Sequence, residues 1–455
     1  MKKMNVRQLV VLGGVMLMGI GIAGCSQLPK DSENVKVPEQ AEVTGQENES
    51  SENSEEKAVI RFSWWGGDAR HEKTVAAVEA FMKENPNIEV KCEYQAWTGY
   101  EDATSLAINT GNEPDVMQIN WGWVYDYSKG GTEFLDLNQV SDIINLDDYD
   151  PKLLDLLTVD GHLEAIPVAI NGRVVCWNKT TFDAIGVKIP ESLDDLYAAG
   201  AAFKSYGEDY YPLALNELDR MIYMVSYLES KYGKNWVENN QLQYTPEEIK
   251  EGLEFIQKLE DEHVIPSLAK LAGDGADAIN TNPNWIDGHY AGCYEWDSSI
   301  DKFEDNLKDG QEFVVGDFLS GMGDYQGGFT KIALGFAISA DTKYPKECAQ
   351  LIEYMMSGNG VDILGADRGI PASKTGLERC RQMDLLNPKK AYANELVVNY
   401  ASFSLDRTFE SPELKSTDGL YYDVFQKLSY NRADTMELAQ YMGAEIQKVL
   451  DKKSK

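Results

Sequence analysis

Residues 58–120 alternate between strand-like and helix-like patterns, and this alternation constrains the fold of the chain more than any other feature. Apolar or period-two runs, typical of β-strands, cover residues 58–64, 88–94 and 115–120. Between them apolar residues recur at helical spacing, and Asn85-Pro86 and Gly111 mark the two helix ends. This β-α-β-α-β order predicts an α/β fold with an open, mostly parallel sheet flanked by helices. Such sheets bind ligands beyond the carboxyl ends of their strands.

Large aromatic residues gather where these three predicted strands end. They are Trp64, Trp65, Trp97, Tyr100, Trp121 and Trp123, and their neighbours are glycine or polar residues such as Gln95 and Asn120. Aromatic rings stack against the C–H faces of a pyranose, while amide, carboxylate and guanidinium groups bind its hydroxyls. The pattern therefore predicts a cleft that binds a sugar. The alternative is that these rings belong to the core.

The first 57 residues predict the location of the protein. A cationic start precedes a short apolar run that ends in Ile22-Ala23-Gly24-Cys25. This junction resembles the lipobox of bacterial lipoproteins. The resemblance implies a signal peptide over residues 1–24, lipidation of Cys25 and an anchor on the outer face of the cytoplasmic membrane, in a Gram-positive host. Residues 25–57 lack aromatic side chains and are rich in Glu, Ser, Asn and Gln, which is typical of a disordered tether.

Charge, cysteines and histidines exclude several classes of function. The chain of 455 residues has a net charge of −33, which argues against nucleic acid or an anionic lipid surface as a partner. Its length after the tether favours two domains. Apart from Cys25, the cysteines show no C-x-x-C spacing, and the four histidines show no ligand spacing. We therefore expect no disulfide framework, no metal site and no cofactor.

The folded region resembles family 1 extracellular solute-binding proteins, the carbohydrate-binding lipoproteins of ABC importers, which are structurally akin to maltose-binding protein. The resemblance covers residues 58–450. It is carried by the order and spacing of Trp64-Trp65-Gly66-Gly67 and residues 109–115, 166–171, 292–296, 334–338 and 368–371. It implies a two-lobe periplasmic-binding-protein fold of class II type, in which each lobe is an open, mostly parallel sheet flanked by helices. The implied N-terminal lobe holds residues 58–169 and 329–369, and the C-terminal lobe holds residues 170–328 and 370–455, with hinge crossings between them.

The resemblance also implies a function and a set of ligand-binding residues. The protein would act as a monomer that captures a sugar between the lobes and delivers it to a membrane permease, and the several tryptophans favour an oligosaccharide. The first wall of the site would hold Trp64, Trp65, Trp97, Asn120 and Trp121, with Gln95 as a polar neighbour. The second would hold Asn171, Trp285, Glu295, Trp296 and Asp297, with Arg368 close to a crossing. Asn216, Gly327 and Gly328 are weaker candidates, and Arg173 is equally well explained as a surface residue paired with local acids.

Two other functions stay open at this point. The same fold could bind a polyamine, a peptide or an iron complex. Alternatively, Glu295 and Asp297 could be the carboxylate pair of a secreted glycosidase, because residues two apart on a strand share a face. No further carboxylate at another strand end stands out, which favours a binding protein over an enzyme.

Overall fold

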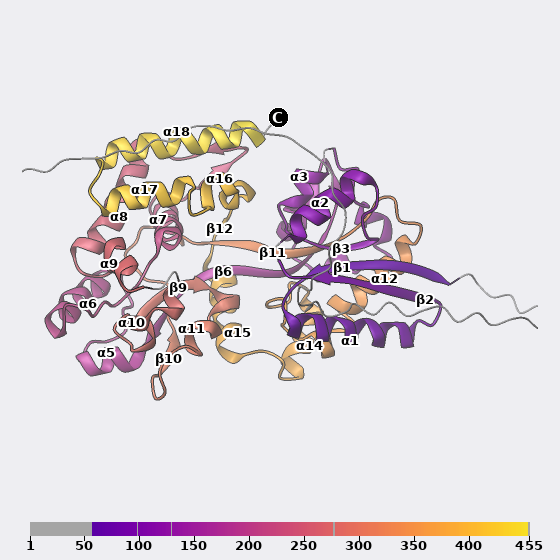
Figure 1. Cartoon of the computed structure of the whole chain (residues 1–455), viewed down its shortest axis with the longest axis horizontal. Helices are drawn as coiled ribbons and strands as arrows, with labels where there is room; N and C mark the ends of the chain where they lie inside the picture. Colours follow the sequence, from indigo (N-terminus) through magenta and orange to yellow (C-terminus); the bar gives the residue numbers. More distant parts are fainter. Residues whose placement is uncertain (1–56, 98, 129, 276–277, 454–455) are drawn as a thin grey trace, which may run out of the picture. The chain divides into compact units, whose positions relative to one another are not determined.

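The computed structural model of the chain describes residues 57–97, 99–128, 130–275 and 278–453 (Figure 1). The predicted signal peptide, the lipidated Cys25 and the tether up to residue 56 lie outside the described residues. Of the helices in the described ranges, none has the length and apolar character needed to span a membrane.

Over residues 58–120, the order of strands and helices is the one that the sequence predicts. The strands are β1 (Ala58–Trp65), β2 (Ile88–Gln95), β3 (Val116–Ile119), β4 (Thr158–Val159), β5 (His162–Leu163), β6 (Ile166–Asn178), β7 (Val237–Glu238), β8 (Gln241–Leu242), β9 (Gly292–Trp296), β10 (Phe313–Val315), β11 (Phe329–Ile338) and β12 (Phe403–Ser404). The helices are α1 (Asp68–Glu84), α2 (Tyr100–Thr110), α3 (Trp123–Tyr127), α4 (Pro151–Asp155), α5 (Lys179–Ile185), α6 (Leu193–Tyr206), α7 (Glu217–Tyr232), α8 (Pro246–Asp261), α9 (Leu268–Gly273), α10 (Pro283–Ile286), α11 (Asp301–Glu304), α12 (Pro345–Met356), α13 (Val361–Leu364), α14 (Lys374–Gln382), α15 (Pro388–Tyr400), α16 (Pro412–Lys415), α17 (Leu420–Ser429) and α18 (Thr435–Lys453).

The predicted α/β fold is confirmed, and its largest sheet is mixed. The strand order is β10-β6-β11-β3-β1-β2, with β9 added to β6 and β12 added to β11. β1 pairs in parallel with β2 and β3, as the β-α-β-α-β order predicts. β11 runs antiparallel to β3 and β6, and β6 runs antiparallel to β9 and β10, so the sheet is less parallel than expected. The sheet is mixed because β11, which lies between β3 and β6, runs in the direction opposite to both.

Buried hydrophobic side chains form two clusters, and the long strands β6 and β11 contribute to both. β6 supplies Ile166 and Val168 to the first cluster and residues from Val174 onward to the second. β11 supplies Phe329 to the second cluster and Ile332 to the first. The two strands pair side by side along their shared length (Figure 1). On both β6 and β11, the polar residues that stand between the two apolar groups therefore lie where the two hydrophobic clusters meet.

The segment that follows residue 370 contacts the first cluster. Ser373 donates a hydrogen bond to Asp148, and Thr375 donates to the same carboxylate through its backbone N–H and its hydroxyl. Ala372 belongs to the first cluster, whereas Ala393 and Val397 of α15 belong to the second. The predicted lobe boundaries, including a crossing at residues 369–370, stay a proposal.

A buried carboxyl group in the first core leads to a prediction about pH. Glu164 is 0% exposed; the Ser128 hydroxyl donates to its Oε1 at 2.7 Å, and its Oε2 has no hydrogen-bond partner in the described part of the chain. Burial raises the pKa of Glu164 from its ordinary value of 4.5 to about 7. A raised carboxyl pKa contributes stability that is complete below about 4.5 and is lost as the pH rises through about 7.

We therefore expect Glu164→Gln to flatten the pH dependence of stability. Between pH values of about 5 and 8, the free energy of unfolding of the natural protein should fall by roughly 1–3 kcal/mol more than that of the variant. Urea unfolding at several pH values measures this difference. Parallel curves for the two proteins would show that Glu164 does not titrate in this range.

Candidate functional site

Three adjacent strands place four polar and aromatic residues on one face of the sheet. Trp296 of β9 lies directly opposite Arg173 of β6, and Asn171 of β6 lies opposite Lys331 of β11. Residues two apart on a strand share a face, and so do residues paired across strands. Trp296, Arg173, Asn171 and Lys331 therefore form one continuous surface, which we call the junction face, where β6 and β11 pass between the two hydrophobic clusters.

Two cations contact the indole ring of Trp296. The guanidinium carbon of Arg173 lies 4.6 Å from the ring centroid, and the Lys331 Nζ lies 4.4 Å from it. Both distances are within the range of cation–π interactions. The ring of Trp296 is half-buried, whereas Arg173 is only 5% exposed. The junction face thus presents an aromatic ring together with two positive charges.

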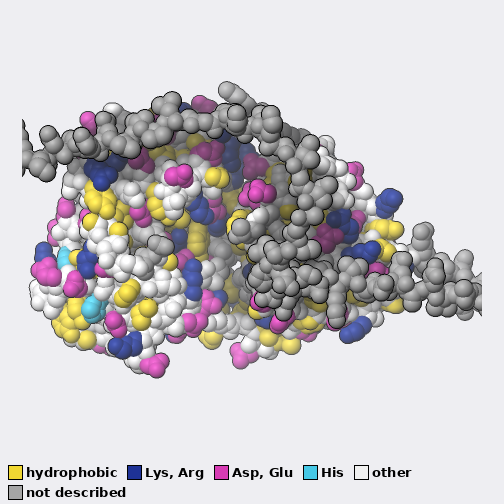
Figure 2. Space-filling model, in the orientation of Figure 1, with side chains coloured by type: hydrophobic (Ala, Val, Ile, Leu, Met, Phe, Trp, Pro, Cys, Tyr) yellow, Lys and Arg dark blue, Asp and Glu magenta, His cyan; other side chains and the backbone are white. Residues whose placement is uncertain are grey.

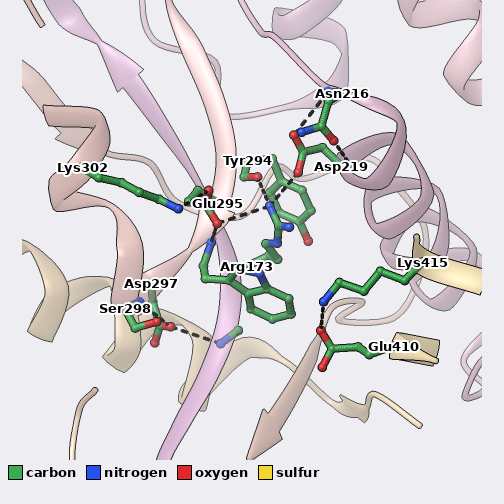
Figure 3. A network of polar contacts seen from close by, with 12 residues as sticks. Arg173, Asn216, Asp219, Tyr294, Glu295, Asp297, Ser298, Lys302, Glu410 and Lys415 are labelled. Carbon is green, nitrogen blue, oxygen red and sulfur yellow. Dashed lines mark hydrogen bonds and ion pairs between the residues drawn. The ribbon is translucent and has the colours of Figure 1, made fainter. Parts of the chain in front are cut away.

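Arg173 is held by carboxylates from two elements (Figure 3). Its Nη1 lies 2.8 Å from Asp219 Oδ1 and 3.6 Å from Glu295 Oε1, and it also donates to the carbonyl oxygen of Tyr294. Asp219 is itself fixed at the start of α7, because its backbone N–H donates to the Asn216 side chain at 2.9 Å in a capping box. Burial raises the pKa of Asp219 to about 6, although the positive charge of Arg173 acts to lower it. The Nε of Arg173 has no hydrogen-bond partner among the described residues.

Lys331 belongs to a second ionic group. It pairs with Glu410, whose other carboxylate oxygen lies 2.6 Å from Lys415 Nζ (Figure 3 labels Glu410 and Lys415). Burial lowers the pKa of Lys331, and the positive charges of Lys415 and Arg173 act in the same direction. Burial alone would raise the pKa of Glu410, but the two lysines lower it to about 2.

The ion pairs around the junction face leave an excess of positive charge. Arg173, Lys302, Lys331 and Lys415 face the carboxylates of Asp219, Glu295 and Glu410. This excess stands in contrast to the whole chain, whose net charge is −33, and to the mixture of acidic and basic side chains on the face seen in Figure 2. An anionic group placed at the junction face would relieve the repulsion between the two cations that contact Trp296.

The opposite face of β6 is closed by packing. Asp297 is 0% exposed and accepts hydrogen bonds from the backbone N–H of Gly172 at 3.3 Å and from Asn394 Nδ2 at 2.6 Å. Burial raises the pKa of Asp297 to about 6. A Cβ on Gly172 would collide with Val397 and with the backbone of β11. Asp297 therefore anchors the strand to α15 and does not face the same space as Arg173.

A cluster of aromatic rings lies at the end of β1 and on the segments that follow β2 and β3. The ring centroids of Trp65 and Trp97 are 5.0 Å apart, and Trp123 lies 5.8 Å from Trp65 and 6.1 Å from Trp97. Trp97 is 46% exposed and Trp65 is half-buried. Tyr100 packs at 5.2 Å from Trp65. The structure thus brings together two of the predicted site tryptophans, with Trp97 available to a ligand.

Other predicted site residues lie in the cores or in local hydrogen bonds. Trp64 and Trp285 are 0% exposed, and Trp121 is 4% exposed. Arg368 is buried, where its guanidinium donates to Gln118 at 2.8 Å and to Thr74 at 2.9 Å, and burial lowers its pKa to about 9. The Asn120 side chain accepts from the backbone N–H of Gly122, and the exposed Gln95 borders a pocket of about 300 Å3 beside α2. These residues are left out of the site that we propose.

The sequence does not single out Lys331 as a site residue, and it leaves the role of Arg173 open. The sequence does carry a signal for Lys331, because a lysine within the mostly apolar run of residues 329–338 is unusual for a buried strand. Of the weaker candidates, Gly327 serves a close approach to α7, because a Cβ there would collide with Ser226 and Ser230. Gly328 has a φ of +94° and donates its backbone N–H to Glu229 of the same helix at 3.2 Å. In the described part of the chain, no group of three His, Cys, Asp or Glu side chains could hold a metal ion.

The known proteins similar to this chain include binding proteins and designed esterases. An uncharacterised ABC transporter extracellular-binding protein from Pyrococcus horikoshii is 24% identical over 314 residues, covering 64% of this chain and 66% of that protein. A binding protein from Brucella abortus is 25% identical over 152 residues, covering 32% of this chain and 36% of that protein. The chain thus spans less than two thirds of the length of these curated relatives.

The similarity to solved structures extends over their whole length. An oligogalacturonide-binding protein from Yersinia enterocolitica is 33% identical, with a TM-score of 0.79 and coverage of 88% of this chain and 100% of that chain. It is also known in complex with saturated digalacturonic acid. A de novo designed cysteine esterase is 32% identical, with a TM-score of 0.82 and coverage of 88% of this chain and 99% of that chain.

The sequence also matches the family model of bacterial extracellular solute-binding proteins over residues 76–383, which is more than half of the chain. This match and the likeness to the Yersinia protein confirm the resemblance seen in the sequence. The chain therefore belongs to the family of bacterial extracellular solute-binding proteins and has the fold of the periplasmic members.

Proposed function

We propose that this protein is the substrate-binding component of an ABC importer and that its ligand is an acidic oligosaccharide of the oligogalacturonide type. The observation that carries the substrate class is the junction face, where Arg173 and Lys331 both contact the ring of Trp296. A uronate residue offers a carboxylate to the two cations and a sugar ring to the aromatic surface. The Yersinia protein, which binds oligogalacturonides, supports the same substrate class.

The aromatic cluster would provide a second part of the binding surface. Trp97 and Trp65 offer partly exposed rings on which a further sugar residue stacks. Two separate surfaces, one cationic and one aromatic, suit a ligand of more than one sugar unit. Binding to both would stabilise the ligand-bound conformation by a shift of population, with β6 and β11 as the connecting strands.

The remaining parts of the proposal concern the membrane. Lipidation of Cys25 would anchor the protein outside the cytoplasmic membrane, and the segment 25–57 would let the folded part reach a permease. The resemblance to importer components is the support for proposing that the protein delivers its ligand to that permease as a monomer. These statements rest on the lipobox pattern and on the family, and mass spectrometry of the mature N-terminus from membranes tests the lipid anchor.

Two alternatives are disfavoured by specific contacts. A polyamine would bring positive charge to the two cations of the junction face, which repels it. For a glycosidase, Asp297 would have to reach the glycosidic oxygen, but its carboxylate is buried and accepts from Gly172 and Asn394. Glu295 has different partners, because it accepts from the backbone N–H of Trp296 and pairs with Lys302. Among the described residues, no partner shared by the two carboxylates therefore supports their use as a catalytic pair.

A thermal-shift screen of the purified protein tests the proposal. The panel contains digalacturonic acid, trigalacturonic acid, maltotriose, spermidine and a peptide mixture. A ligand at about 100 times its Kd should stabilise the fold by about 2.7 kcal/mol, a rise of a few degrees in Tm. We expect this rise with the galacturonides, and we expect it to shrink at high salt because charges carry part of the binding.

The other outcomes are equally informative. A rise with maltotriose but not with galacturonides would keep the sugar-binding function and overturn the acidic substrate. A rise with spermidine alone would assign the protein to the polyamine binders. Release of reducing sugar from trigalacturonic acid would establish the enzyme.

A comparison of two tryptophans tests the aromatic part of the site. Trp97→Ala should weaken the binding of trigalacturonic acid by about 1–3 kcal/mol and leave stability nearly unchanged, because the ring is 46% exposed. Trp64→Ala is the matched control: its ring is fully buried, so its loss should cost about 3–5 kcal/mol of stability. Calorimetric titration and urea unfolding measure the two effects. Full affinity in Trp97→Ala would remove the aromatic cluster from the site.

A further inference from the structure

Two buried cysteines lie directly opposite each other on neighbouring strands. In the antiparallel pairing of β6 with β9, Cys176 is the partner of Cys293. Both side chains are almost completely buried, at 0% and 1% exposure, and both are free thiols in this structure. The other described cysteines, Cys92, Cys348 and Cys380, lie on β2, α12 and α14.

The register of the strands sets the distance between the two cysteine backbones. The backbone N–H of Asn178 donates to the carbonyl oxygen of Ala291 at 2.8 Å. Cys176 precedes Asn178 by two residues and Cys293 follows Ala291 by two, so the cysteines occupy the same kind of hydrogen-bonded pair. In such pairs the Cα atoms are about 5.5 Å apart and the side chains share a face. This separation lies inside the range of about 4.4–6.8 Å found in disulfides. The Cβ atoms of directly opposite residues are about 4.5–5.5 Å apart, against about 3.5–4.5 Å in a disulfide, so the bond draws the two strands slightly together.

We infer that Cys176 and Cys293 form a cross-strand disulfide when the chain folds in an oxidising compartment outside the cytoplasm. The family is extracellular, where disulfides persist. As the S–S bond forms, the two thiols lose two protons and two electrons. The electrons reduce the disulfide of a thiol–disulfide oxidant, whose two sulfurs take up the protons and leave as thiols.

Burial determines when this bond can form. Burial raises the pKa of the Cys293 thiol well above its ordinary value, and Cys176 acts in the same direction. Because the thiolate is the attacking species, the Cys293 thiol reacts slowly in the folded protein, and complete burial keeps an oxidant away from Cys176. The bond therefore forms during folding, before the core closes over the two sulfurs. Once formed, it fixes β6 to β9 three residues away from the Arg173–Trp296 pair.

Refolding of the full chain with and without an oxidant tests this inference. The protein is unfolded in denaturant with reductant and then refolded in a glutathione buffer or, in parallel, in reductant. Free thiols are alkylated under denaturing conditions, and the peptides are mapped by mass spectrometry. We expect the peptides of Cys176 and Cys293 to be joined after oxidative refolding, and the Tm of this sample to rise by a few degrees over the reduced one.

Controls separate this pair from other thiol chemistry. Cys92→Ser should leave the linked peptides intact, whereas Cys176→Ser should abolish them and leave Cys293 free for alkylation. Exposure of the already folded, reduced protein to the same buffer should give little of the linked product over the same time. Alkylation of both cysteines after oxidative refolding to the native circular dichroism spectrum would overturn the inference. So would linkage of either one to another cysteine or to glutathione. Because the mapping is done on the natural sequence, it does not depend on the folding of any variant.

Discussion

Replacing Lys331 by methionine is expected to weaken the binding of digalacturonic acid by roughly 10- to 150-fold. The lysine ammonium lies 4.4 Å from the centre of the Trp296 ring, on the junction face that we propose for the uronate carboxylate. A hydrogen bond to a charged group contributes about 1.5–3 kcal/mol, which corresponds to this loss of affinity. Methionine keeps most of the side-chain volume against the indole. Isothermal titration calorimetry of the two proteins measures the change in Kd.

The matched control for this variant is Lys415→Met. Lys415 pairs with the same carboxylate of Glu410 as Lys331 does, but among the described residues the cations that contact the Trp296 ring are Arg173 and Lys331. Each variant leaves Glu410 with one lysine partner, so both should remain folded, but Lys331→Met should lose more stability than Lys415→Met, because the Lys331 side chain is 13% exposed and that of Lys415 is 39% exposed. Affinity should fall in Lys331→Met and stay within a few-fold in Lys415→Met. Equal affinities in Lys331→Met and the natural protein would show that the carboxylate of the ligand is not bound at the junction face.

Replacing Arg173 by methionine should lower the free energy of unfolding by about 3–5 kcal/mol, the largest loss of stability that we expect from removing one charge. Arg173 is 5% exposed, and its removal leaves Asp219 and Glu295 in the interior without their main cation. Burial already raises the pKa of Asp219 to about 6. Without the guanidinium, this carboxyl should be harder still to ionise. The loss should therefore be larger at pH values of about 8 than near 5, since a raised carboxyl pKa costs stability as the pH increases.

Two further variants test the cause of this loss. Arg379→Met removes an arginine that pairs with Asp362, but both side chains are about one third exposed, at 32% and 31%, so its cost should stay below about 1 kcal/mol. The double variant Arg173→Met/Asp219→Asn should recover part of the lost stability, because the isolated carboxylate is gone. Urea unfolding at the two pH values measures all of these differences. A loss in Arg173→Met that is independent of pH and not reduced in the double variant would point to lost packing instead of buried charge.

The alternation of strands and helices could be predicted because its signals are local. Periods of two and 3.6 residues, together with Asn85-Pro86 and Gly111, define β1, α1, β2, α2 and β3 without knowledge of any distant contact. The antiparallel pairing of β6 with β9 and β10 could not be predicted in this way. Pairing partners come from distant parts of the chain, and the direction of a strand leaves no mark on its own residues.

The tryptophans show the same limit within the site. Trp64 and Trp65 are neighbours on one strand, so they point to opposite faces of the sheet. Trp64 lies in the first core, and Trp65 joins Trp97 and Trp123. Sequence composition predicts that aromatic rings gather at these strand ends, but which of the two faces is covered depends on the helices that pack there.

The α/β class, the resemblance to extracellular solute-binding proteins and the region of the chain that carries aromatic residues can all be predicted from the sequence, because they depend on local pattern and order. Only the tertiary structure placed Arg173, Lys331 and Trp296 together and set Cys176 opposite Cys293. Each of these groupings joins residues from β6 and from β9 or β11, which are far apart in the sequence. Their proximity follows from strand register, and register is decided by the packing of the whole sheet.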